Sequence, residues 1–341
     1  MPPRPWAPAR SSPSRRAAAT ALLLATAAVA AHAADAPDLC RATAAQAPSA
    51  PRAGLLVAEA RAQHRRFGGQ RIDTAGRLVR AGHGEAEFDR NPGDTEPTWR
   101  QVQRFWQAWS PDEPARVRDS HGRFQRTDLL RQAVRAAGTA RLNSFGGDLR
   151  DLGLSAQEAD ALDTSVLRAA LVDTPWSAVF VSYLVRSAGY DAREFRFSDA
   201  HADYARAALA TGHRETDGRA DPGAYRACDP ATTAPRPGDL LCSTRARAAV
   251  LDSFDALAPA LEAGGPLPMH CDLVVAVDAA ALQAEAIGGN VLQSVTLREL
   301  RLQPAPTPGA PPLLDPAYRA RAAAADAGFN DQPWVLLLQL R

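Results

Sequence analysis

The chain has 341 residues, which is enough for one large or two ordinary domains with a sizeable core. Its 39 basic and 38 acidic side chains nearly cancel. Because the chain also lacks basic runs, we exclude nucleic acid as a partner and electrostatic docking on a membrane surface.

The first 33 residues have the pattern of a secretory signal peptide. Four arginines precede the uncharged run AAATALLLATAAVAAHA, which ends in the small-residue pattern of residues 31–33. We expect cleavage after Ala33, with an uncleaved N-terminal anchor as the alternative. No later run approaches the roughly 20 apolar residues that a membrane helix needs, so the mature protein is expected to have no integral membrane segment. The expected location is the periplasm or the cell exterior.

The residues that follow predict a leader and then a helical region. Residues 34–54 are rich in alanine and proline and predict a flexible leader. Within residues 55–170, apolar residues recur at helical spacing and Ser155 with Glu158 forms a capping box. The run TWRQVQRFWQAW places its aromatic residues on one helical stripe, which predicts core packing rather than a ligand platform. We find no chemical motif in this region.

Residues 171–341 predict an α+β domain. The segments HCDLVVAVD, AEAIGGN, SVTLREL and PWVLLLQLR each have the β-branched or apolar pattern of a strand, and turn residues separate them. One helix ahead of an antiparallel sheet is an α+β architecture.

That helix is predicted from DTPWSAVFVSYLVRSAGY. Thr174 is suited to cap it and Pro175 suits its first position, and Gly189 ends the segment. Ser177 therefore falls in the first turn, where free N–H groups and the helix dipole favour developing negative charge. This makes Ser177 a candidate for chemistry.

A second group of polar residues follows in FSDAHADY. Ser198, His201 and Tyr204 are three residues apart and would share a helical face shortly after the Ser177 helix. Together with Trp176 they are candidates for lining a substrate groove. A solvated helix face is the alternative for this segment.

The four cysteines are Cys40, Cys228, Cys242 and Cys271, an even number in a chain expected to be exported. Three pairings are possible. We predict Cys242 with Cys271, because their strands are expected to be neighbours, and Cys40 with Cys228. No zinc-type spacing or clustered histidine and cysteine pattern occurs, so we expect neither a metal nor another cofactor.

The order of four motifs carries a family resemblance. TPWSAVFVSYL, RPGDLLC, HCDLVVAV and IGGNV follow one another over roughly residues 171–300. This order resembles the CHAP and NlpC class of papain-like amidases and peptidases that cut bacterial cell-wall peptides. More narrowly, PWSAVFVSYLVRSAG, FSDAHADY, HCDLVV and IGGNVLQSVTL resemble the bacterial domain of unknown function 2272 family. The resemblance implies a papain-like fold with serine in place of the usual cysteine.

The resemblance also implies roles for particular residues. Ser177 would be the nucleophile, His270 the base and Asn290 the residue that orients the imidazole. His270 and Asp272 share one face of their strand, so Asp272 is a rival orienting group. A structural histidine at a strand start and a plain Gly-Gly-Asn turn remain the alternatives for His270 and Asn290.

Two main functions follow from these expectations. The first is a secreted hydrolase of peptide or amide bonds in peptidoglycan that uses Ser177, His270 and Asn290. The second is a catalytically inactive papain-like module that binds peptidoglycan or another envelope partner, because a serine hydroxyl gains little from a helix terminus alone. A purely structural envelope protein is a third possibility. The sequence leaves open whether the protein is an enzyme.

Overall fold

The computed structural model describes residues 38–46, 48, 51–85, 96–109, 155–158 and 174–341, and the single residues 161, 164, 165, 168 and 171. The predicted signal peptide and its cleavage site lie outside the described residues. At the predicted boundary between residues 170 and 171, only residue 171 is described. Residues from Leu39 to Arg341 group into one compact unit.

Helices and strands both contribute to this unit, which confirms an α+β architecture. The helices are α1 (Leu39–Thr43), α2 (Arg52–Arg66), α3 (Thr98–Trp109), α6 (Ser177–Ser187), α7 (His201–Thr216), α8 (Phe254–Ala263) and α9 (Ala317–Arg321). The strands are β1 (Gln70–Ile72), β2 (Leu78–Arg80), β3 (Tyr225–Cys228), β4 (Leu240–Thr244), β5 (Met269–Asp278), β6 (Gln283–Val291), β7 (Ser294–Gln303), β8 (Leu313–Leu314) and β9 (Trp334–Leu340). A 3-10 helix spans Ala246–Val250.

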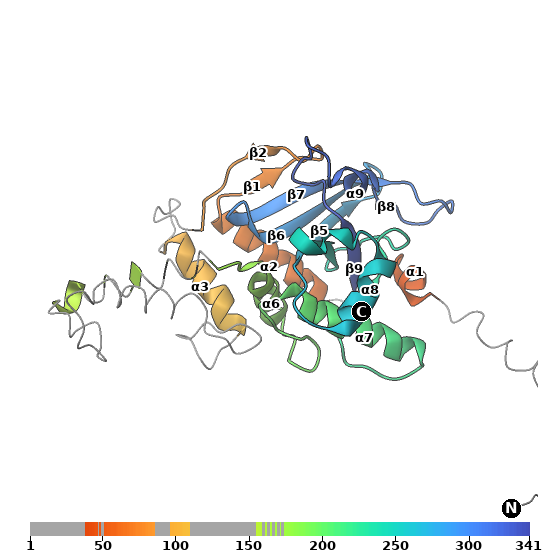
Figure 1. The fold of residues 1–341 in the computed structure, drawn as a ribbon, viewed down its shortest axis with the longest axis horizontal. Coiled ribbons are helices and arrows are strands. Elements are labelled where there is room, and N and C mark those ends of the chain that lie inside the picture. Colours follow the sequence, from red (N-terminus) through yellow and green to blue (C-terminus); the bar gives the residue numbers. More distant parts are fainter. Residues whose placement is uncertain are drawn as a thin grey trace, which may run out of the picture. The chain divides into compact units, whose positions relative to one another are not determined.

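The strands form one mixed sheet in the order β2-β1-β7-β6-β5-β4-β9-β3, and β8 pairs with β7 (Figure 1). Strands β3 to β9 pair antiparallel, as the sequence predicts, whereas β1 joins β7 in parallel. Strands β1 and β2 lie within residues 55–170, which the sequence pattern predicts as helical. Their signal is weak because each has three residues and β1 depends on pairing with the distant β7.

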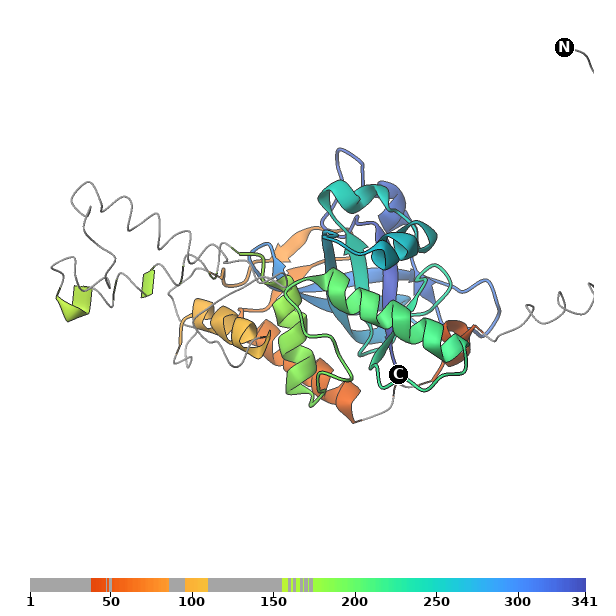
Figure 2. The same cartoon turned by 60° about the horizontal axis from the view of Figure 1, so that its bottom comes forward.

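The main core lies between the helices and one face of the sheet. Alternate residues of β5, such as Cys271 and Leu273, pack in this core with the buried face of α6. Helix α6 lies against β5 and β6 and also contacts α2 and α3. Figure 2 turns α6 and α7 toward the viewer, in front of the strands. A smaller cluster, which includes Val274 and Tyr318 of α9, covers the opposite face.

The aromatic stripe of α3 is buried, as predicted. Trp99, Phe105 and Trp106 are at most 4% exposed. The ring of Phe105 lies 5.6 Å from the ring of Trp176 and 5.2 Å from the ring of Phe180. This aromatic cluster fixes the start of α6 against the rest of the core.

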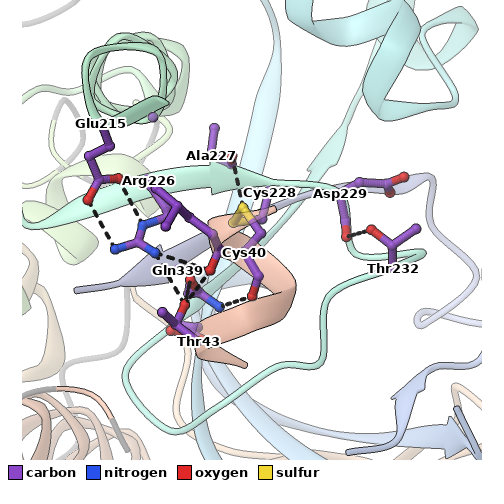
Figure 3. Close-up of a disulfide and its surroundings, with 12 residues drawn as sticks. Cys40, Thr43, Glu215, Arg226, Ala227, Cys228, Asp229, Thr232 and Gln339 are labelled. Carbon is purple, nitrogen blue, oxygen red and sulfur yellow. Dashed lines mark hydrogen bonds and ion pairs between the residues drawn. A yellow bond between two sulfur atoms is a disulfide. The ribbon is translucent and has the colours of Figure 1, made fainter. Parts of the chain in front are cut away.

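Two disulfides form with the predicted pairing. Cys242 and Cys271 are directly opposite on the paired strands β4 and β5. Cys40 and Cys228 join α1 to β3 across 188 residues (Figure 3).

Helix α1 lies within residues 34–54, which the composition predicts as a flexible leader. It is held not only by its disulfide but also by a hydrogen bond of 2.9 Å from Gln339 Nε2 to the Cys40 carbonyl (Figure 3). Arg226 Nη1 donates to Thr43 Oγ1 at 3.2 Å. These contacts come from residues far along the chain, so local composition does not predict them.

Candidate functional site

The site begins at the N-terminus of α6, where Ser177 is the first helical residue. The preceding residue, Trp176, has no side-chain hydrogen bond that caps the helix. Asn290 supplies an acceptor instead: with its amide suitably oriented, its oxygen accepts from the Trp176 N–H at 3.1 Å and its nitrogen donates to Glu85 Oε2 at 3.2 Å. Glu85 also accepts a hydrogen bond from the Trp176 indole. Asn290 therefore stabilises the helix start.

The side chain of Ser177 contacts a histidine of another helix. Its Oγ lies 2.7 Å from Nε2 of His201, the first residue of α7. The other ring nitrogen of His201, Nδ1, is hydrogen-bonded to the Tyr204 hydroxyl. Ser177 is 8% exposed, His201 is 4% exposed and Tyr204 is 1% exposed. The two helix starts thus form a buried chain of three polar side chains.

A second polar chain starts from β5, next to the first. His270 Nε2 lies 2.6 Å from Asp272 Oδ1, and Arg298 Nε donates to Asp272 Oδ2 at 2.9 Å. His270 and Asp272 lie on one face of β5, as predicted from strand alternation. The rings of His201 and His270 pack edge to face with 5.4 Å between their centroids, which brings the two chains together.

The environment keeps both histidines neutral at neutral pH. Burial lowers the pKa of His270 to about 4, the Arg245 guanidinium adds to this effect, and Asp272 opposes it. Burial also lowers the pKa of His201 to well below its usual value, aided by His270 and Arg245. Burial tends to raise the pKa of Asp272, but His270 and Arg298 outweigh it and hold that pKa at about 2. Asp272 is therefore ionised.

The two glycines of the GGN motif make room for this arrangement. A Cβ atom on Gly288 would lie 1.7 Å from Asp272 Oδ1 and 3.0 Å from His270 Nε2. A Cβ atom on Gly289 would lie 2.6 Å from the side chain of Phe180 in α6. Gly288 therefore leaves room for the side chains of His270 and Asp272, and Gly289 leaves room for α6. Asn290 follows with a φ of 55°, a conformation that asparagine tolerates better than most residues.

The structure brings together part of the predicted site. Ser177, His201, Tyr204 and His270 form one cluster with Asp272 beside it, and the hydrogen bond of Ser177 goes to His201. The orienting contact to His270 comes from Asp272, whereas the hydrogen bonds of Asn290 go to the helix start and Glu85. The catalytic roles themselves stay predictions.

The other predicted binding residues lie beside this cluster. Trp176 is fully buried in the aromatic core. Ser198 is 1% exposed, accepts from the Ala200 N–H at 3.1 Å and donates to Asp203 at 2.7 Å, so it organises the turn before α7.

A cavity of about 350 Å³ has Tyr204, Phe195 and Tyr225 in its wall. In this wall, Thr211 and Arg214 each donate a hydrogen bond to the Asp221 carboxylate.

The sequence interpretation assigned no role to three charged residues of the site, Arg298, Arg245 and Glu85. Arg298 lies in a largely buried strand, and a charge in such a position is a usable signal because it needs a buried partner. Arg245 directly follows β4, and its positive charge lowers the pKa of both His201 and His270. Glu85 reaches Trp176 from 91 residues away, so its neighbours in the sequence give no indication of this role.

Within the part of the chain that the structure describes, no three His, Cys, Asp or Glu side chains are grouped so that they could hold a metal ion. Nor does any helix in the described ranges combine the length and apolar character that crossing a membrane requires.

Comparison with known proteins identifies one family. The family model described as "Uncharacterized protein conserved in bacteria (DUF2272)" matches residues 93–340, which include the whole cluster from Ser177 to Arg298. The comparison found no match to a curated protein and none to a solved structure.

Proposed function

The chain belongs to the DUF2272 family of bacterial proteins, and we propose that it is a hydrolase of peptide or amide bonds with Ser177 as the nucleophile. The observation that carries this proposal is the buried cluster at the start of α6, in which Ser177 Oγ lies 2.7 Å from His201 Nε2 and His270, oriented by Asp272, packs against His201. A serine at a helix start and a histidine oriented by a carboxylate are the types of group that serine-type acyl transfer uses.

We extend the proposal to the fold type. In a papain-like core of the CHAP and NlpC kind, a helix carries the nucleophile and packs on an antiparallel sheet that carries the histidine. In support, α6 begins at Ser177 and lies against β5, the strand of His270. Asp272 takes the place of the asparagine that the sequence resemblance implied as the orienting residue.

The reaction would proceed in two acyl-transfer steps. Ser177 Oγ attacks the carbonyl carbon, its proton passes to a histidine, and the π electron pair moves to the carbonyl oxygen. Collapse of this intermediate expels the amine, which takes the proton from the histidine and leaves an ester on Ser177. Water then hydrolyses the ester by the same sequence and restores the serine. Free N–H groups in the first turn of α6 are suited to stabilise the oxyanion.

The proposed substrate is cell-wall peptide, most simply peptidoglycan, in the periplasm or outside the cell. Support comes from the signal-like segment of residues 1–33 and from two disulfides, which persist in oxidising compartments. The mature chain would carry a net charge of −3, because removal of four arginines leaves 35 basic and 38 acidic side chains.

Burial of the site favours a second candidate, a papain-like module that binds envelope peptides without turnover. Ser177 is 8% exposed and both histidines are less exposed still. A serine hydroxyl also depends on an aligned base far more than a thiol does. In such a module the cluster would stabilise the groove and the serine would not react.

Incubation of the mature protein with purified peptidoglycan separates these candidates. The hydrolase proposal predicts that soluble muropeptides appear in mass spectra, that Ser177→Ala abolishes their release and that Ser187→Ala, an exposed serine of the same helix, leaves release intact. If the wild type binds peptidoglycan without release, and Ser177→Cys creates activity, the protein is a binding module.

A further inference from the structure

The two histidines of the site use their ring nitrogens differently. Both nitrogens of His201 are hydrogen-bonded, one to Ser177 and one to Tyr204. His270 bonds Asp272 through Nε2, and within the described residues its buried Nδ1 has no hydrogen-bond partner. A neutral imidazole has one N–H donor and one lone-pair acceptor, so these contacts determine which nitrogen of each ring is able to take a proton.

Tyr204 decides the state of His201. Its hydroxyl is 1% exposed, and the described part of the chain offers the hydroxyl proton one acceptor, Nδ1 of His201. Leaving a buried hydroxyl proton unbonded costs about 1–3 kcal/mol. A phenol is also a stronger donor than the alcohol of Ser177. Tyr204 therefore donates to Nδ1, and the proton of His201 is on Nε2.

With that proton on Nε2, His201 donates a hydrogen bond to Ser177 Oγ. It has no lone pair on the side of the serine and is unable to accept the serine proton. The contact of 2.7 Å thus holds the oxygen in position without activating it.

His270 has the same tautomer, but its other ring nitrogen has no hydrogen-bond partner among the described residues. The Asp272 carboxylate, which also accepts from Arg298, is an acceptor, so Nε2 of His270 carries the proton. The lone pair is then on Nδ1, the unpartnered nitrogen. The ring of His270 packs against the ring of His201, whose own Nε2 contacts Ser177.

We infer, on the basis of the proposed hydrolase function with His270 as the base that the family resemblance implies, that His201 is a hydrogen-bond donor to Ser177 and not a second base, and that Tyr204 is a positioning residue that fixes His201 in this tautomer. In the attack step the Ser177 proton passes to one bridging water as that water gives a proton to His270 Nδ1, while the Oγ electron pair bonds to the carbonyl carbon. The proton on His201 Nε2 stays in place throughout.

The first test reads the tautomers without needing activity. Two-bond nitrogen–proton NMR of the ¹⁵N-histidine protein resolves the two nitrogens of each ring, and the chain has only seven histidines. We expect the proton on Nε2 in both His201 and His270. In Tyr204→Phe, His201 should shift toward a mixture of tautomers, whereas Tyr225→Phe, which removes a buried hydroxyl bonded to the Gly238 carbonyl, should leave it unchanged. A wild-type proton on His201 Nδ1, or an unchanged spectrum in Tyr204→Phe, overturns the assignment.

The second test separates a donor from a base by conservative substitution. Glutamine keeps an N–H donor near the position of Nε2 but does not accept a proton. We expect His201→Gln to retain kcat within about tenfold, whereas His270→Gln lowers kcat by roughly 10²- to 10⁴-fold, the usual contribution of a general base. Equal losses in the two variants, or the larger loss in His201→Gln, overturn the assignment while the hydrolase proposal stands. A wild type without turnover refutes the hydrolase proposal, and the NMR spectrum then decides the tautomer assignment alone.

Discussion

His270 Nε2 lies 2.6 Å from Asp272 Oδ1, and the two residues are 1% and 0% exposed. Burial of an ion is costly, and here Arg298 compensates the carboxylate charge from the far side of Asp272. Burial and the Arg245 guanidinium hold the pKa of His270 at about 4, so its imidazole is neutral at neutral pH. A neutral, oriented imidazole is the state that a base requires.

The charge of Arg245 should set the pH at which His270 titrates. Arg245→Gln removes a positive charge that disfavours protonation, so the pKa of His270 should rise from about 4. If His270 is the base, the acidic limb of the kcat/KM profile should move to higher pH together with this pKa. NMR titration of His270 measures the pKa, and Arg247→Gln on the neighbouring exposed turn is the control. An unchanged titration would contradict this electrostatic role for Arg245.

His270 should also make stability depend on pH. Its folded pKa of about 4 lies below the ordinary histidine value of 6.5, so between these values the unfolded chain binds a proton that the folded chain does not. Acidification therefore destabilises the fold. The contribution of this residue to the loss of unfolding free energy from pH 7 to pH 5 is on the order of 2 kcal/mol. Urea titrations should show the pH dependence reduced by that amount in His270→Gln, and an equal dependence in both proteins would argue against the lowered pKa.

Gly288 should tolerate no side chain. Gly288→Ala would place a Cβ atom 1.7 Å from Asp272 Oδ1, so the buried chain of His270, Asp272 and Arg298 must shift. We expect a loss of about 1–3 kcal/mol, as for other overpacked cores. The control is Gly54→Ala in α2, where no atom lies within 4 Å and alanine should stabilise the helix by about 0.5–1 kcal/mol. Chemical denaturation measures both, and a neutral Gly288→Ala would show that the close approach is absent.

The two disulfides should differ in their contribution to stability. Cys40–Cys228 closes 188 residues of chain and Cys242–Cys271 closes 29. By loop-closure entropy their loss should cost roughly 5 and roughly 4 kcal/mol, respectively. Unfolding of the paired cysteine-to-alanine variants tests this order. A negligible cost for Cys40→Ala with Cys228→Ala would show that α1 is not part of the cooperative fold.

The sequence predicts those parts of the molecule that depend on local pattern. The helix that begins at Ser177, the strand that carries His270 and Asp272, and both disulfide pairs are as expected. The strand follows from alternation and the Cys242–Cys271 pair from strands that are neighbours in the sheet. The helix start differs in detail, because Trp176 occupies the cap position that the sequence pattern assigns to Thr174.

Contacts between distant elements are not predicted. His201 was expected to line a groove, yet its ring nitrogen contacts Ser177 across two helix starts, a geometry that only the packing of α6 and α7 determines. Asn290 was expected beside the imidazole, and its left-handed backbone instead places its amide at the Trp176 N–H. Strand β1 likewise depends on its pairing with β7.

The central claim is that Ser177 is a nucleophile. Reaction of the mature protein with a fluorophosphonate, followed by intact mass and peptide mapping, tests it most directly, because this reagent bonds covalently to an activated serine oxygen. We predict one adduct, located on Ser177, that is lost in Ser177→Ala and retained in Ser187→Ala. Release of muropeptides by a protein that forms no adduct, or forms it on another serine while Ser177→Ala stays active, would contradict the claim.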